Sequence, residues 1–202
     1  MKSIFTILAA TIVTTLAVEI EPIPSEEVGK VARKIISQYG VPADAPMATE
    51  VDTEKAVGIK GGQAGLVVMP DKKLTAESLG AATEKPAAIG QLWMHKVVPV
   101  VSGTAPAAAK LRTVEFGENE NRKSVEVYYL SVSKTSAGAL ELALTGRDKE
   151  PLVKVPLVKT DAAASTAPMA VTASKEGEHT GVLVLSLFGS YKADISITKA
   201  AE

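Results

Sequence analysis

The spacing of apolar residues changes once along the chain. Between residues 25 and 39, apolar side chains recur every three or four positions, as at Val28, Ala32 and Ile35. That is the period of one face of an α-helix. From residue 56 onward the period is close to two, which is typical of β-strands with one buried face. The pattern predicts one amphipathic helix followed by a β-domain.

The limits of the predicted helix follow from residues at its two ends. Ser25 is a favoured N-cap residue, and Glu26 and Glu27 lie in the first turn, where the helix dipole favours negative charge. Gly40 follows the last apolar position and suits the left-handed conformation that often ends a helix. We expect a helix over residues 25–39 whose apolar stripe packs on the main body.

Ten segments of the chain have strand character. They span residues 57–60, 66–69, 92–98 with a continuation to 101, 111–116, 125–133, 140–145, 152–158, 169–173, 182–188 and 191–198. After residue 110 the connections are short, which forces neighbouring strands to be antiparallel because parallel pairs need long crossovers. A short helix over residues 75–82, capped by Thr75, is expected between two strands.

The fold class predicted from these elements is mainly β. We expect an antiparallel β-sandwich of the immunoglobulin-like or jelly-roll-like kind, with about eight to ten strands. One N-terminal amphipathic helix and one short inserted helix complete it.

Three local features refine this prediction. Gly189 is expected at the first central position of a type II′ turn in a hairpin. Residues 182–185 are all apolar, which predicts a central strand covered on both faces. Pro156 cannot donate a hydrogen bond to a neighbouring strand, so its segment should lie at a sheet edge or a bulge.

The first seventeen residues have the three regions of a secretory signal peptide. Lys2 provides the positive charge, residues 4–16 are uncharged and largely apolar, and Ala17 ends a stretch suited to cleavage. We therefore expect an exported protein, in the periplasm, the outer envelope or the extracellular space, with no membrane insertion after cleavage. The predicted organisation is a signal peptide over 1–17, a lead, helix and wrapping loop over 18–55, and the sandwich domain over 56–202.

The charge and residue inventory offers little for catalysis or for nucleic-acid binding. The 22 basic and 23 acidic residues form no basic run longer than a pair, so no nucleic-acid partner is expected. Cysteine is absent and there are two histidines, His95 and His179, so no metal ligand set has the usual spacing. No nucleophile motif is present, and we expect no catalytic residues and no cofactor.

Two loops resemble ligand loops only superficially. The glycine cluster over residues 58–65 leads into a predicted strand, whereas a phosphate-binding loop opens a helix. The acidic residues of 117–121 lack the pattern of a calcium loop. Both segments are interpreted as hairpin loops.

The run over residues 89–101 carries the one tryptophan of the chain and one of its histidines. Gln91, Trp93 and His95 alternate along it and therefore share one face of a strand. We predict that this face contacts a ligand or a partner. The alternative is a long central strand, ended or bulged by Pro99, with the indole in the core.

The functional expectation is a non-catalytic role in protein–protein binding, as an adaptor or in envelope assembly, with another envelope or extracellular protein as partner. Three alternatives stay open. A small-ligand carrier would have its site near Trp93 and His95. A fibre or coat subunit would add strands at the edge formed by residues 152–158, and homo-oligomerisation belongs with this alternative. The third is an unrecognised hydrolase.

Overall fold

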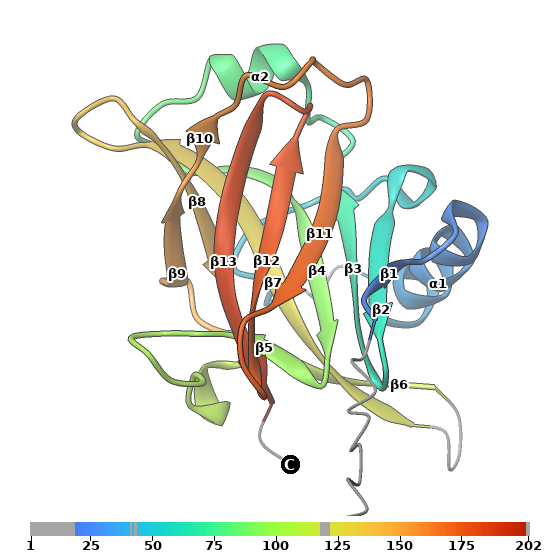
Figure 1. Cartoon of the computed structure of the whole chain (residues 1–202). Coiled ribbons are helices and arrows are strands. Elements are labelled where there is room, and N and C mark those ends of the chain that lie inside the picture. The colour runs from blue at the N-terminus through green and yellow to red at the C-terminus, as the bar shows by residue number, and fades with distance from the viewer. Residues whose placement is uncertain (1–18, 41, 43, 118–121, 201–202) are drawn as a thin grey trace, which may run out of the picture.

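The computed structural model describes residues 19–40, 42, 44–117 and 122–200. Two antiparallel sheets face each other, and the longer helix lies beside the larger sheet (Figure 1). This arrangement confirms the predicted fold class, a mainly β protein built as a sandwich with two α-helices. The predicted signal peptide and most of the acidic loop over 117–121 lie outside the described residues.

The larger sheet has eight strands in the order β1-β2-β3-β4-β7-β8-β9, and β6 pairs with β7 off this path. The strands are β1 (Glu21–Pro22), β2 (Val57–Gly61), β3 (Ala64–Pro70), β4 (Ala87–His95), β6 (Thr113–Phe116), β7 (Lys123–Lys134), β8 (Leu140–Thr145) and β9 (Pro151–Pro156). Pro156 ends an edge strand, as its lack of an amide proton predicted.

The smaller sheet has five strands in the order β10-β13-β12-β11, and β5 also pairs with β13. The strands are β5 (Val97–Pro99), β10 (Val158–Lys159), β11 (Met169–Lys175), β12 (Thr180–Leu187) and β13 (Tyr191–Lys199). The expectation that residues 182–185 are covered on both faces is wrong. Strand β12 is central, but Leu183 and Leu185 are buried while Val182 and Val184 are half-buried, because no element of the described chain covers the outer face.

Two segments predicted as single strands are divided between the sheets. The predicted strand over 92–98, with its continuation to 101, breaks at Lys96, whose φ of 62° turns the chain from β4 into β5. The predicted strand over 152–158 breaks at Leu157, between β9 and β10. Strands β5 and β10 then pair with opposite ends of the same edge of β13. The chain thus passes from one sheet to the other at two corners.

Helix α1 (Ser25–Tyr39) has the predicted limits. Its N-cap is Pro24 instead of Ser25, because Ser25 already has helical geometry and makes no capping hydrogen bond with its side chain. The Pro24 carbonyl accepts a hydrogen bond from the Val28 amide at 3.0 Å. At the other end Gly40 has a φ of 57°, and its amide donates to the Ile36 carbonyl.

The remaining helical segments are short. Helix α2 (Ala76–Gly80) begins at a capping box in which Thr75 and Ser78 each bond the backbone amide of the other at 3.0 Å. It lies between β3 and β4, as the inserted helix was predicted to do. The 3₁₀ segments are η1 (Thr53–Lys55) and η2 (Ala108–Lys110).

The turn between β12 and β13 differs from the predicted type II′ turn. Phe188 and Gly189 both have positive φ, at 51° and 67°. Two positive values in succession are the pattern of a type I′ turn, whose twist matches that of the flanking strands. The glycine cluster over 58–65 forms the β2–β3 hairpin, as expected, with Gly62 in the turn at a φ of 59°.

Strands β4 and β7 are buried on both faces, so the protein has two cores. The inner core lies between the sheets and includes Leu92, Met94, Tyr128 and Leu130. The outer core lies between the larger sheet and α1; it comprises Val28, Ala32, Ile35, Val51, Ala56, Val67, Met69, Trp93, Val125, Val127 and Tyr129. Full burial of a large apolar side chain contributes about 1.5–3 kcal/mol to the free energy of unfolding. The smaller sheet and α1 therefore both stabilise the larger sheet.

Gly90 is the position where the backbone of β4 leaves no space for a side chain. A Cβ atom there would lie 2.3 Å from the Met69 carbonyl oxygen and 3.0 Å from the Pro70 Cα. We expect Gly90→Ala to lower the free energy of unfolding by about 2 kcal/mol or more, because backbone atoms cannot move aside cheaply. Chemical denaturation of the purified protein measures this difference.

Gly80→Ala is the matched control, since no heavy atom lies within 4 Å of its built Cβ. Its free energy of unfolding should stay within about 1 kcal/mol of the parent. Equal effects of the two substitutions would contradict the close approach at Gly90.

Candidate ligand-binding site

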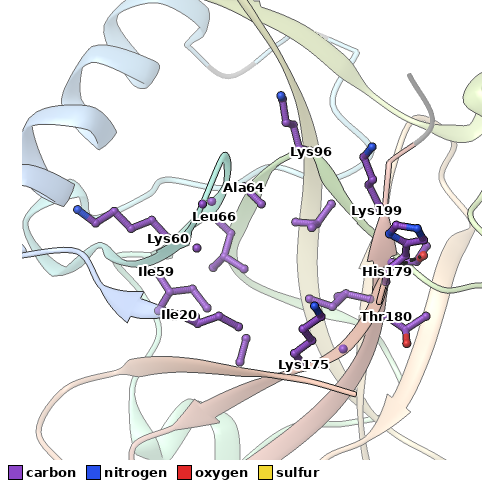
Figure 2. Close-up of a pocket in the computed structure, with 18 of the residues that line it drawn as sticks. Ile20, Ile59, Lys60, Ala64, Leu66, Lys96, Lys175, His179, Thr180 and Lys199 are labelled. Carbon is purple, nitrogen blue, oxygen red and sulfur yellow. Dashed lines mark hydrogen bonds between the residues drawn. The ribbon is translucent and has the colours of Figure 1, made fainter. Parts of the chain in front are cut away.

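An apolar cleft opens at one end of the sandwich. Its walls are the β2–β3 hairpin and the ends of β11, β12 and β13, and β5 begins beside it (Figure 2). The cleft has a volume of about 340 Å³. Small-ligand sites in proteins have volumes of about 300–1,000 Å³ and are mainly apolar, so the cleft is large enough for a small ligand.

The apolar walls continue the inner core to the surface. They are formed by Ile20, Ile59, Leu66, Val97, Ala173 and Ile197. Ile59 and Leu66 are each 5 % exposed and belong to the inner core, whereas Val97, Ala173 and Ile197 are half-buried. Ile20 is 36 % exposed and is one of two large apolar side chains that the described chain leaves exposed. Apolar area thus remains that a bound molecule could cover.

Charged side chains line the mouth of the cleft. Lys60, Lys96, Lys175 and Lys199 are exposed lining residues, and Glu178 is the one acidic side chain among them. Lys96 reaches this position because it occupies the corner between β4 and β5, and its ammonium donates to the Gln63 side-chain oxygen in the β2–β3 turn. The mouth of the cleft therefore has an excess of positive charge.

A second hollow adjoins the cleft and shares Gly62, Gln63, Lys96 and Lys199 with it. Its volume is about 800 Å³, and its other lining residues are His95, Arg122, Lys123, Ser124, Glu126 and Ala200. Figure 2 shows the amino groups of Lys96 and Lys199 on the same side of the cleft. These two lysines stand at the boundary between the apolar cleft and the polar hollow.

Glu126 is a buried carboxyl group in the wall of the second hollow. It is 8 % exposed, and its Oε2 has no hydrogen-bond partner within the described part of the chain. Burial raises the pKa of this carboxyl, and nearby Glu115 adds to the increase. Tyr128 lies two residues further along the same face. Its hydroxyl has no partner among the described residues, and burial raises its pKa as well.

The predicted contact residues Gln91, Trp93 and His95 lie on one strand, β4, but not in one environment. Gln91 and Trp93 are 1 % and 4 % exposed and line neither hollow. His95 is half-buried, lies at the edge of the second hollow, and has its Nδ1 2.8 Å from the Ser124 carbonyl oxygen. Of the three residues, His95 is the one that the fold brings near the cleft.

Gln91 and Trp93 belong to a hydrogen-bond chain within the outer core. The Trp93 indole donates to the Gln91 Oε1 at 3.0 Å, and the Gln91 Nε2 donates to the Thr49 hydroxyl at 2.7 Å. The ring of Tyr39, at the end of α1, lies 6.0 Å from the indole ring. Buried polar groups need such partners, so these hydrogen bonds hold Thr49 on the sheet, and the Tyr39 contact packs the end of α1 beside the indole.

Within residues 19–40, 42, 44–117 and 122–200, no group of three His, Asp or Glu side chains could hold a metal ion. No helix of the described chain is long and apolar enough to cross a membrane. His179, at the mouth of the cleft, lies 3.9 Å from the Glu178 carboxylate, and both are exposed.

The sequence carried little sign of this site. Its lysines come from four strand ends or corners that are far apart in the chain, and none belongs to a basic run. Only the glycine cluster over 58–65 marked one wall, and it was interpreted as a hairpin loop. Comparison of the chain with protein-family models, curated proteins and solved structures returned no match. The site is therefore argued from its geometry.

Replacement of Gln91 tests the buried hydrogen-bond chain. Gln91→Leu would leave the Trp93 indole and the Thr49 hydroxyl without their partners. We expect a loss of about 1–3 kcal/mol in the free energy of unfolding, the usual cost of an unsatisfied buried polar group. Gln38→Leu, on the exposed face of α1, is the control and should change this value little. Equal stabilities of the two variants in urea would contradict the role of Gln91.

Replacement of Glu126 tests the buried carboxyl through its pH dependence. An acid with a raised pKa in the folded state costs stability above its ordinary pKa of 4.5, which it has in the unfolded chain. Glu126→Gln should therefore stabilise the protein at neutral pH, and this gain should vanish as the pH falls below that value. Urea unfolding across this range measures the gain. The exposed Glu84→Gln is the control, and a gain independent of pH would refute the assignment.

Proposed function

We propose that this chain is an exported, non-catalytic binding protein whose ligand site is the apolar cleft at the end of the sandwich. The observation that carries the proposal is an opening of about 340 Å³ lined by partly exposed aliphatic side chains. Burial of such surface by a ligand is favourable by about 25 cal/mol for each Å². The apolar part of a small molecule is the chemistry that these walls suit.

The burial pattern favours this site over the one predicted around Trp93. The indole is packed beneath α1 on the outer face of the larger sheet, whereas Leu66 and Ile59 belong to the inner core. A ligand in the cleft is therefore separated from Trp93 by the sheet itself. We therefore favour the small-ligand carrier, which was an alternative to the protein–protein binding role expected from the sequence, and we move its site from Trp93 to the inner side.

Assembly by strand addition is less well supported at the edge predicted for it. Strand β9 forms that edge, and it begins and ends with Pro151 and Pro156. Proline removes a backbone donor and is a common means of protecting a sheet edge from pairing. We therefore place ligand binding ahead of fibre or coat assembly.

Filling the cleft with a larger side chain tests the proposal. Ala173 lines the cleft from β11. We expect the purified protein to enhance the fluorescence of the uncharged apolar probe N-phenyl-1-naphthylamine. Ala173→Phe should fill the cleft and weaken binding of the probe about tenfold or more, which is a loss of about 1.4 kcal/mol in binding free energy. Trp93 emission should not shift on binding.

Ala170→Phe is the matched control, because Ala170 lies on the same strand but is exposed on the outer face. It should bind the probe like the parent protein. Thermal unfolding of both variants establishes that they are folded. If the parent protein gives no enhancement, or if both variants bind equally, the cleft is not the ligand site.

A further inference from the structure

We propose that the ligand is a single-chain amphiphile with an anionic head group, bound with its apolar chain in the cleft and its head between Lys96 and Lys199. This inference rests on the proposed function and adds the chemistry of the ligand. It comes from the junction of two hollows of different character that share these two lysines.

The balance of charge around the junction favours an anion. Lys96, Lys199, Arg122 and Lys123 line the second hollow, and Glu126 is the one acidic side chain among the described residues that line it. These cations come from the corner after β4, the last residue of β13, and the start of β7 with the residue before it. Several cations beside low-dielectric walls concentrate the electric field and attract an anionic group.

Acidic groups near the cleft limit where the head can lie. Glu178 faces the mouth from the β11–β12 turn, beside His179. Glu21 lies directly opposite Lys60 in the pairing of β1 with β2, and it offsets that lysine. Lys96 and Lys199 are the two lysines that line both hollows, and Lys96 is held at the turn by Gln63. The Lys199 amide donates to the His179 carbonyl oxygen at 2.9 Å, so this strand end is also fixed. The head group is therefore assigned to these two lysines.

The buried Glu126 sharpens the assignment because it distinguishes an anionic head from a cationic one. Its Oε2 is unpartnered in the wall of the hollow. A cationic head would use this carboxylate as its acceptor and lose affinity in Glu126→Gln. An anionic head is opposed by the carboxylate and gains affinity in the same variant, because the amide is neutral and can donate a hydrogen bond.

Three ten-carbon ligands that differ in the head group test the proposal. Decanoate, decanol and decyltrimethylammonium are compared as monomers by displacement of N-phenyl-1-naphthylamine. We expect decanoate to bind about fivefold or more tightly than decanol, an advantage of about 1 kcal/mol, and decyltrimethylammonium to bind most weakly. The advantage of decanoate should shrink as ionic strength rises from about 0.05 M to about 0.5 M, because salt screens exposed charges.

The double variant Lys96→Gln, Lys199→Gln should remove most of the advantage of decanoate and leave decanol binding unchanged. Lys73→Gln, Lys85→Gln is the matched control: these exposed lysines flank α2, at the opposite end of the sandwich (Figure 1). It should retain the full advantage. Glu126→Gln should strengthen decanoate binding by about two- to fivefold, in line with removal of one like charge.

The outcomes separate this inference from the proposed function. If decanol and decanoate bind equally and Ala173→Phe weakens both, the cleft is a ligand site but the head-group assignment is wrong. If neither displaces the probe, both proposals fail. A protein that co-floats with phosphatidylglycerol vesicles but binds no monomeric decanoate recognises a lipid surface, and that result also overturns the inference.

Discussion

The constraint on which the structure depends is the burial of β4 and β7 on both faces. Leu92 and Tyr128 face the smaller sheet, while the neighbouring Trp93 and Tyr129 face α1. A strand pair of this kind cannot be covered by one layer, because alternate side chains point in opposite directions. The second sheet packs on one face of this strand pair, and the N-terminal helix packs on the other (Figure 1).

The double burial also explains the polar groups within the cores. Under α1 the Gln91 side chain links Trp93 to Thr49, so the indole nitrogen and the loop hydroxyl are both satisfied. In the inner layer Glu126 and Tyr128 have polar atoms without partners in the described chain. The Gln91 side chain thus satisfies the polar groups around the indole, whereas, among the described residues, Glu126 and Tyr128 keep unpartnered atoms on the face of the larger sheet that packs on the smaller one.

The corner at Lys96 joins the architecture to the candidate site. The chain passes there from β4 into β5 of the opposite sheet, and Lys96 adopts a positive φ at the corner. The same corner carries the lysine to the boundary of the two hollows, close to the end of β13. One backbone feature therefore connects the sheets and places a charge beside an apolar opening.

The sequence alone determined the features that depend on near neighbours. Helix α1, the N-cap at Thr75, the antiparallel strands and the edge position of Pro156 follow from periodicity, caps and missing donors within a few residues. Tertiary structure decided the rest: segments of strand character continue on both sides of the corners at Lys96 and Leu157, so the sequence pattern joined each pair of strands into one. The cleft depends on which strand ends the two sheets bring together, and so does the meeting of its lysines, because charges distant in sequence become neighbours only when the sheets pack.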